Sequence, residues 1–103
     1  MNRISVVIPV YNEEQNVAES FRELSGVMDS FGREYELIYI DDGSRDNTIK
    51  NLIAAAKGTD HLRLIQFRRN FGQTAAMAAG LDYSRYEIVI TLDGDLQNDP
   101  AEI

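Results

Sequence analysis

The sequence predicts an α/β fold with a mainly parallel sheet flanked by helices. Four apolar runs of strand length alternate with three segments in which apolar residues recur at helical spacing. The connections between them are only a few residues long, as in consecutive βαβ units. We therefore expect residues 1–103 to form one segment built from four strands and three helices.

The first strand is expected at residues 4–10, because an unbroken apolar run is typical of a parallel strand buried on both faces. Asn12 is a suitable helix N-cap, and Gln15 three residues later completes the pattern of a capping box. Gly32 is expected to end the helix. The apolar stripe of this helix comprises Val17, Phe21, Leu24, Met28 and Phe31.

The second strand is expected at residues 35–40, and the polar turn after it opens with Asp41 and Asp42. A helix from about Asp46 to near Gly58 should follow. Its inward residues are predicted to be Ile49, Leu52, Ile53 and Ala56.

The third and fourth strands are expected at residues 62–67 and 87–92, with a helix rich in small residues between them. Small side chains on one face of this helix would let it approach the sheet closely. That face comprises Ala75, Ala76, Ala79 and Gly80.

The composition limits the classes of protein to which the chain can belong. It is 44% hydrophobic and 26% charged, and no apolar run approaches the roughly 20 residues of a membrane span. The absence of cysteine excludes disulfides and thiol catalysis and fits a reducing cytoplasm. The formal net charge of −7 argues against non-specific nucleic-acid binding. Because no closing element follows the fourth strand, we expect an N-terminal part of a longer protein.

Each predicted strand ends in a polar cluster. In an open parallel sheet the carboxyl ends of the strands share one edge, and ligands bind there. The first three clusters supply an aromatic face, carboxylates that suit hydroxyl or imide N–H groups, and cations. These residues are Tyr11, Glu13, Asp41, Asp42, Arg68 and Arg69.

Two carboxylates, Asp93 and Asp95, follow the fourth strand one residue apart. This spacing, beside an amide oxygen, suits a hard divalent cation that keeps coordination positions free for a phosphate. A cation would also explain how an acidic chain binds an anionic ligand. Together the four clusters hold the parts needed to bind a base, a ribose and a diphosphate.

Each cluster also has a plainer interpretation. Residues 42–44 form an ordinary turn before a helix, and residues 12–13 fit a helix start, where carboxylates complement the macrodipole. The arginine pair at residues 68–69 is of a kind more often solvated than bound to a ligand. Four such clusters at successive strand ends, however, favour one shared ligand site.

Four sequence motifs carry a resemblance to a known family. They are VVIPVYNEE (residues 6–14), IDDGSRDNT (40–48), RNFGQTAA (69–76) and LDGDLQ (92–97). In this order and spacing they resemble the inverting family 2 glycosyltransferases, above all the dolichol-phosphate mannose synthases and bactoprenol-phosphate glucosyltransferases. The resemblance implies a GT-A fold, whose Rossmann-like N-terminal half binds a nucleotide sugar.

The resemblance also implies roles for individual residues. Pro9 and Tyr11 border the nucleotide base, on which Tyr11 stacks, and Glu13 reaches the ribose hydroxyls. Ile40 and Asp42 line the base pocket, where Asp42 accepts a hydrogen bond from an N–H on the base edge. The residues that match a segment beside the nucleotide are Arg68, Asn70 and Gly72.

The last motif is implied to hold the diphosphate end of the donor. Asp93 and Gly94 lie against the nucleotide, and Asp95 is the principal ligand of Mg²⁺ or Mn²⁺, with Gln97 as an auxiliary ligand. Asp93 and Asp95 would thereby serve catalysis, because the cation neutralises the diphosphate as it leaves.

A polyprenyl-phosphate acceptor at the inner face of a membrane is the acceptor that the resemblance implies. Its phosphate has a second pKa of about 6 and therefore needs little help from a general base. The acceptor-binding residues are expected outside these 103 residues, so the chain alone should be inactive. Its exposed sheet edge should favour self-association.

Other classes of function remain open at this point. The chain could be a folded but inactive nucleotide- or metal-binding module. An aspartate-based phosphotransferase of the haloacid-dehalogenase kind also places Asp-x-Asp after a strand, although after its first strand. A receiver-like signalling domain has paired acidic residues too, but again after the first strand rather than the second.

Overall fold

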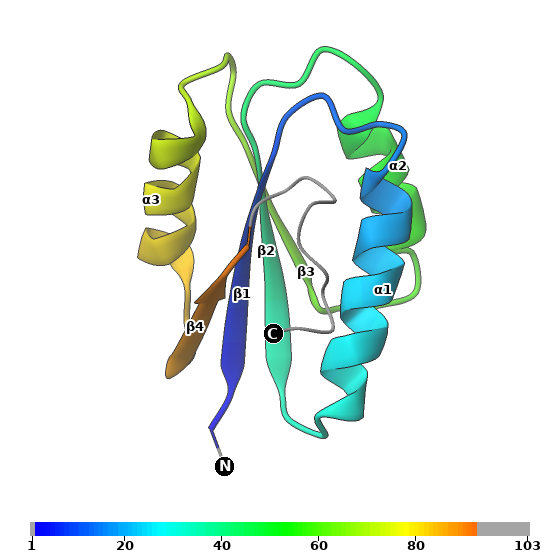
Figure 1. The fold of residues 1–103 in the computed structure, drawn as a ribbon, viewed down its shortest axis with the longest axis vertical. Helices are drawn as coiled ribbons and strands as arrows, with labels where there is room; N and C mark the ends of the chain where they lie inside the picture. The colour runs from blue at the N-terminus through cyan, green and yellow to red at the C-terminus, as the bar shows by residue number, and fades with distance from the viewer. Residues whose placement is uncertain (1, 93–103) are drawn as a thin grey trace.

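A computed structural model describes residues 2–92 and shows a parallel four-stranded sheet between two layers of helices (Figure 1). The strands run in the order β3-β2-β1-β4. They are β1 (Ile4–Val10), β2 (Tyr35–Asp41), β3 (Leu62–Gln66) and β4 (Ile88–Thr91). The helices are α1 (Val17–Ser30), α2 (Thr48–Ala55) and α3 (Gln73–Tyr83). The predicted α/β class with a parallel sheet is confirmed.

The strand order contains a topological switch point between β1 and β4. From β1 the chain moves outward to β2 and β3, and it then returns across the sheet to place β4 on the other side of β1. Val6 of β1 therefore lies between Leu37 of β2 and Ile90 of β4. In open α/β sheets ligands bind outside the carboxyl ends of the strands at such a point.

Helices α1 and α2 cover one face of the sheet (Figure 1), and most of the buried residues lie there. Four members of the predicted α1 stripe are at most 2% exposed: Val17, Phe21, Leu24 and Met28. The prediction was wrong for Phe31, which follows the helix and is 43% exposed, and for Ile53 of α2, which is 55% exposed. Leu52 and Ala56 are buried as predicted.

Helix α3 covers the other face through its small residues. Ala76 is fully buried, and a Cβ added to Gly80 would lie 2.2 Å from Val7 Cγ1 and 2.7 Å from Ile40 Cδ1. The helix therefore packs on β1 and β2 at a distance that only small residues permit. The predicted close approach is confirmed.

The predicted N-cap of α1 was wrong. The helix begins at Val17 with Asn16 at the N-cap position, four residues later than the capping box suggested. Asn12 instead has a positive φ of 51°, a conformation that asparagine tolerates better than most residues. Its side chain is hydrogen-bonded to the neighbouring loop, as described below.

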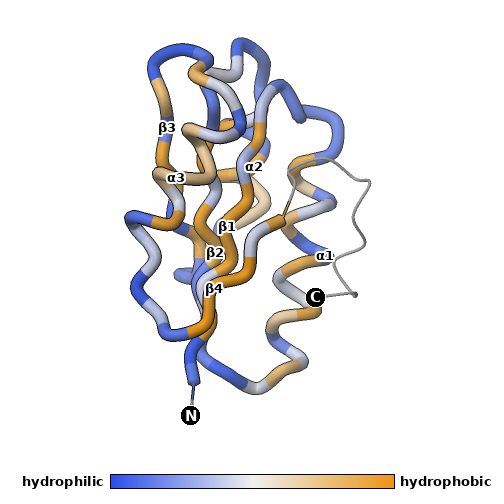
Figure 2. Tube along the Cα trace, turned by 60° about the vertical axis from the view of Figure 1, so that its left-hand side comes forward, coloured by the Kyte–Doolittle hydropathy of each residue, from blue (hydrophilic) through white to orange (hydrophobic). Residues whose placement is uncertain are grey.

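Hydrophobic and hydrophilic residues occupy different parts of the molecule. Figure 2 shows hydrophobic residues concentrated in the strands and hydrophilic residues in the loops beyond their carboxyl ends. Within residues 2–92, no helix is both long and apolar enough to cross a membrane. The polar loops lie at the carboxyl ends of the strands, the edge at which open α/β sheets bind ligands.

Candidate functional site at the carboxyl ends of the strands

The loops that follow β1, β2 and β3 surround a pocket of ≈ 200 Å³. Tyr11 lines it from the first loop, residues 43–45 from the second, and residues 66–70 from the third. Tyr11 is 42% exposed, so its ring can be reached by a ligand that stacks on it. The structure thus brings together three of the four clusters that the sequence placed at one edge.

The first two loops are joined by hydrogen bonds between residues more than thirty positions apart. The backbone N–H of Asn12 donates to Ser44 Oγ (2.8 Å), and Asn12 Oδ1 accepts from the backbone N–H of Arg45 (2.9 Å). The backbone N–H of Glu13 donates to Thr48 Oγ1 (2.8 Å). These bonds fix the position of Tyr11 and Glu13 relative to the second loop.

Two carboxylates that sequence reasoning did not single out extend this network. Asp46 Oδ2 accepts from the backbone N–H of Glu14 (3.3 Å), and Glu14 Oε2 accepts from that of Asn47 (3.3 Å). Asp46 Oδ1 accepts from the backbone N–H of Thr48 (3.0 Å) and from its hydroxyl group. Burial alone would raise the pKa of Asp46, but hydrogen bonds, chiefly those from Thr48, lower it below its usual value.

Asp42 connects the second loop to the third. Its carboxylate accepts hydrogen bonds from the backbone N–H groups of Phe71 (2.7 Å to Oδ1) and Gly72 (3.0 Å to Oδ2), and from Asn70 Nδ2 (3.0 Å to Oδ2). The residue is only 4% exposed. Its carboxylate therefore determines where the segment before α3 lies.

Close backbone contact reinforces this connection. Gly43 has a φ of +79°, and a Cβ there would lie 2.3 Å from the carbonyl carbon of Arg69. A side chain at this position would both strain the turn and collide with the third loop. Glycine is therefore required for the second and third loops to meet at the pocket.

Asp41 is fully buried, and the structure uses only one of its carboxylate oxygens. Oδ2 accepts from the backbone N–H of Ser44 (3.0 Å), whereas Oδ1 has no hydrogen-bond partner within the described part of the chain. Such an atom is costly to bury in isolation. Asp41 is held inside the second loop and is not one of the residues that line the pocket.

Among the described residues, three arginines and no carboxylate line the pocket. They are Arg45, Arg68 and Arg69. None of them forms an ion pair within residues 2–92, although Arg69 lies over the ring of Phe71 at 4.6 Å. Arg45 was not among the predicted site residues, although its place in the polar cluster after the second strand could have indicated it.

Two predicted donor-binding residues lie beneath the pocket rather than along it. Pro9 is buried in β1, opposite Ile40 of β2. Ile40 is fully buried and packs with Val7, Ile38 and Ala76 on the α3 face. Neither is one of the residues that line the pocket, and their contact with a nucleotide stays a prediction.

The predicted metal ligands Asp93, Asp95 and Gln97, together with Gly94, lie outside the described residues. Residues 2–92 contain no cluster of three or more histidine or acidic residues that could hold a metal ion by itself. Leu92 donates its backbone N–H to Val7 O (2.9 Å). The chain thus reaches the switch point beside β1 immediately before the first of the proposed ligands.

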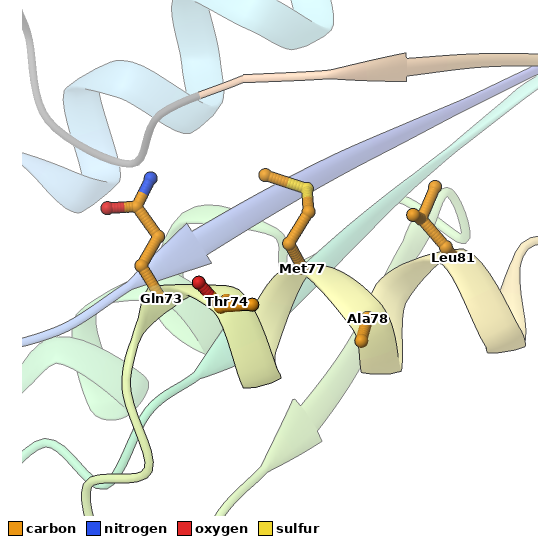
Figure 3. Close-up of a pocket in the computed structure, with 5 residues that line it drawn as sticks. All are labelled: Gln73, Thr74, Met77, Ala78 and Leu81. Carbon is orange, nitrogen blue, oxygen red and sulfur yellow. The ribbon is translucent and has the colours of Figure 1, made fainter.

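A second hollow of ≈ 490 Å³ runs along α3 (Figure 3) and has a different character. Gln73, Met77 and Leu81 point to the same side of the helix, and Thr74 and Ala78 complete the lining. None of these five side chains is ionisable. The described residues that line this hollow therefore include no charged group, unlike those of the pocket at the strand ends.

The fold and the pocket define the class of the protein. A parallel sheet in the order β3-β2-β1-β4, with polar loops converging at the carboxyl ends, is the doubly wound arrangement that binds nucleotides. The chain matches the model of Glycosyl transferase family 2 over residues 5–103. The protein belongs to this family of transferases, and the motifs behind the resemblance are therefore confirmed at the level of the family.

Solved structures with a similar fold are longer than this chain. A mannosyltransferase from Pyrobaculum calidifontis, solved with GDP-Man and Mn²⁺, is 24% identical with a TM-score of 0.79, covering 91% of this chain and 28% of its own. Glucosyl-3-phosphoglycerate synthase from Mycobacterium tuberculosis, solved with Mn²⁺, UDP and phosphoglyceric acid, is 29% identical with a TM-score of 0.74, covering 91% and 33%. The chain thus spans about a third or less of these relatives.

Proposed function

We propose that this chain is the nucleotide-sugar-binding segment of a glycosyltransferase that moves a sugar, with inversion, from a UDP- or GDP-sugar to a polyprenyl phosphate. The observation that carries the proposal is the convergence of three strand-end loops on one pocket beside the switch point. Family membership supports the transfer reaction, and the GDP-Man and UDP bound to the two relatives support the class of donor. The acceptor rests on the four sequence motifs.

The residues of the first loop would hold the nucleoside. Tyr11 presents an exposed ring on which the base can stack, and Glu13, anchored through its backbone to Thr48, would accept hydrogen bonds from the ribose hydroxyls. Arg68 and Asn70 would border the nucleotide from the third loop. The network between the loops positions these groups before the donor binds, which lowers the entropic cost of binding.

Asp93, Asp95 and Gln97 would hold Mg²⁺ or Mn²⁺ beside the diphosphate, with Gly94 against the nucleotide. A divalent cation at this position would neutralise charge on the departing diphosphate. Mn²⁺ in both relatives supports this choice of metal. In the longer protein, Asp93 and Asp95 would therefore be catalytic.

A binding module without activity is the second candidate function. The chain spans only 28–33% of the two relatives, so the acceptor site would be formed by residues outside it. We propose that this segment binds its donor but does not turn it over, and that the longer protein acts at the inner, cytoplasmic face of a membrane in making envelope glycans. Membership of the transferase family argues against both phospho-aspartate alternatives.

Calorimetry with UDP and GDP, each with and without Mn²⁺, tests the proposed function. We expect binding of at least one nucleotide that is strengthened by Mn²⁺, and loss of this metal dependence in Asp95→Ala. A turnover assay with a polyprenyl phosphate, on this chain and on a longer protein that contains it, separates the transferase from the binding module. Absence of nucleotide binding in every case would contradict both.

A further inference from the structure

The strand that leads to the proposed metal ligands is short, and its own residues specify its register on β1 only weakly. Within the described residues, β4 has four residues and pairs with β1 alone. Ile88, Ile90 and Leu92 pack toward the core beneath α1 and α2. A slip of two residues along β1 would bring Ile90 and Leu92 to the places of Ile88 and Ile90, so apolar residues would still face the core. The evenly spaced hydrogen bonds of a parallel ladder would re-form in the slipped register as well.

Such a slip would displace whatever follows the strand. A parallel strand rises about 3.3 Å per residue, so a shift of two residues moves the next segment by about 6–7 Å. The distances between a metal ion and its ligands, in contrast, have to be correct to about 0.2 Å. The proposed ligands begin directly after Leu92. Their placement therefore depends on the register of β4.

Two buried side chains near the amino end of the sheet hold the backbone directly before β4. The N–H of Arg85 donates to Glu36 Oε2 (2.9 Å), and the N–H of Tyr86 donates to Ser5 Oγ (3.2 Å). Ser5 and Glu36 are 0% and 1% exposed, and the hydroxyl of Ser5 donates to Glu36 Oε2 (2.6 Å). The two adjacent strands β1 and β2 thus fix two consecutive N–H groups at the entry to β4.

These bonds discriminate between registers, which the ladder does not. Glu36 Oε1 also accepts from Arg85 Nε (2.9 Å), so the carboxylate contacts this residue through its side chain as well as its backbone. A slip of two residues in one direction would bring Glu87 to the place of Arg85. Two carboxylates would then lie together in a buried position, which is strongly unfavourable.

A third bond before the strand is weaker. The backbone N–H of Arg3 donates to Glu87 Oε2 (2.8 Å), and the two side chains form an ion pair. These side chains are 46% and 49% exposed, and exposed pairs contribute little. The discrimination consequently rests mainly on Ser5 and Glu36.

We propose that Glu36, together with Ser5, is a positioning residue for the metal site: it fixes the register of β4 on β1 and so places the ligands that follow Leu92 at the switch point. This inference rests on the proposed function, which assigns those ligands. Glu36 acts through residues 85–92 from the end of the sheet opposite the strand-end pocket. The buried ion-pair cluster would thereby serve ligand binding as well as stability.

Calorimetric titration with UDP and GDP, each with and without Mn²⁺, tests this role. The quantity of interest is the ratio of the nucleotide affinity with Mn²⁺ to the affinity without it. Glu36→Gln and Ser5→Ala should each lower this ratio about tenfold, as residues that orient metal ligands do, or to one if the unsubstituted ratio is smaller. The affinity without Mn²⁺ should stay close to that of the unsubstituted chain once the folded fraction is taken into account.

The ratio separates positioning from a loss of stability, because an unfolded fraction lowers both affinities alike. Leu52→Ala supplies the matched control, since it removes a fully buried side chain of α2 and destabilises the chain without touching residues 85–92 in sequence. Arg33→Gln, at an exposed arginine between α1 and β2, controls for a surface substitution. Both should leave the ratio unchanged.

Nuclear magnetic resonance reads the register without a nucleotide. In the unsubstituted chain, Val6 should show interstrand contacts to Ile90, its partner in β4, and the amide of Leu92 should exchange slowly because it donates to Val7 O. In Glu36→Gln the contacts between Val6 and Ile90 should weaken, and the exchange of Leu92 should accelerate more than in Leu52→Ala.

The outcomes distinguish this inference from the function on which it rests. If Mn²⁺ strengthens nucleotide binding and both variants keep the full ratio, the positioning role is wrong and the proposed function stands. The role is also wrong if Leu52→Ala lowers the ratio as much as Glu36→Gln, or if the ratio falls while the contacts between Val6 and Ile90 persist. Should Glu36→Gln fail to fold, Ser5→Ala decides. If the unsubstituted chain binds no nucleotide, the proposed function fails and this inference fails with it.

Discussion

The two ends of the sheet use arginine in opposite ways. Toward the amino end of β2, Glu36 is 1% exposed and accepts hydrogen bonds from Arg63 Nη1 (3.0 Å), Arg85 Nε (2.9 Å) and Ser5 Oγ (2.6 Å). At the carboxyl end, Arg45 and Arg68 line a pocket to which residues 2–92 contribute no carboxylate, and neither arginine has an ion-pair partner among those residues.

This difference separates charges that stabilise the fold from charges that are available to a ligand. The Glu36 cluster joins β1, β2, β3 and the segment after α3, so its charges are satisfied by the folded chain itself. A buried carboxylate without such partners would be strongly destabilising. Arg45 and Arg68 are exposed and have no ion-pair partner within residues 2–92, a state that costs little and leaves them available to bind an anion or an acceptor.

The largest expected effect is the loss of the Glu36 charge. Glu36→Gln would leave two guanidinium groups without their carboxylate at the sheet. The arginine side chains are 32% and 57% exposed and can recruit water, so we expect a loss of about 3 kcal/mol, at the low end for a broken buried pair. Urea unfolding measures the change, with Arg33→Gln as the control. A loss below 0.5 kcal/mol, the range of ordinary surface changes, would contradict the structural role.

Asp42→Asn tests a carboxylate that does not follow the contrast between the two ends. Asp42 lies in the loop after β2, at the carboxyl end of the sheet, but its carboxylate is hydrogen-bonded within the chain, as that of Glu36 is. The amide group replaces one acceptor oxygen with a donor that faces backbone N–H groups. We expect a loss of about 1–3 kcal/mol in the free energy of unfolding. Thermal and urea unfolding measure this loss. A free energy of unfolding equal to that of the unsubstituted chain would mean that water replaces the lost bonds.

The pH dependence of stability sharpens the comparison further. Burial alone would raise the pKa of Glu36, but hydrogen bonds from Ser5, Arg85 and Arg63 outweigh it and lower the pKa below its usual value of 4.5. The unfolded state then binds more protons than the native state. The contribution of Glu36 is therefore complete above about pH 4.5 and is lost as the pH falls through the lowered native value.

Urea unfolding between pH 7 and pH 3 tests this dependence. We expect the free energy of unfolding to decrease toward pH 3, and to decrease less in Glu36→Gln. Glu87 adds to the slope in both proteins, because its hydrogen bond from Arg3 lowers its pKa to about 2. Identical slopes in the two proteins would show that Glu36 does not contribute.

A smaller effect is expected for a substitution in the edge strand β4. Within the described residues β4 pairs only with β1, and Val89 is 38% exposed. A lysine at an edge discourages pairing between chains. We expect Val89→Lys to reduce any self-association seen by sedimentation velocity, while a monomeric unsubstituted chain would refute the predicted association.

The smallest expected effect on stability is that of a pocket arginine. Arg68→Gln should change the free energy of unfolding by no more than about 0.5 kcal/mol, because the guanidinium has no partner among residues 2–92. Nucleotide binding should nevertheless weaken. Urea unfolding and calorimetry on the same preparation compare the two effects, and a stability loss as large as that of Glu36→Gln would remove the distinction between the two ends.

Much of the fold could be predicted from local patterns. The expected bounds of all four strands differ from those observed by no more than one residue at either end, because buried parallel strands are continuous apolar runs. The small-residue face of α3 was also predicted, because small side chains on one face of a helix allow it to approach a sheet closely. Ile53 was assigned inward incorrectly, because the rotation of a short helix depends on the elements that pack against it.

The polar residues were harder to interpret. A capping box at Asn12 is a local pattern, but its side chain instead accepts a bond from Arg45, 33 residues away. Asp42 was expected to line the base pocket; the structure bonds its carboxylate to the backbone of Phe71, 29 residues away, and its contact with a base stays a prediction. Tyr11, Arg68 and Asn70 were correctly placed near one another, because parallel strands bring their carboxyl ends to one edge.

The sequence by itself determined the alternation of strands and helices, the edge at which the polar clusters meet, and the family through its motifs. The tertiary structure alone decided which of those polar groups bind each other and which remain available. The physical reason is that a hydrogen bond depends on the distance between atoms of separate loops, which hydrophobic periodicity does not encode. Asp42 and Arg68 look equally functional in the sequence, and only the packed loops show that the carboxylate of Asp42 is hydrogen-bonded within residues 2–92 whereas the guanidinium of Arg68 is not.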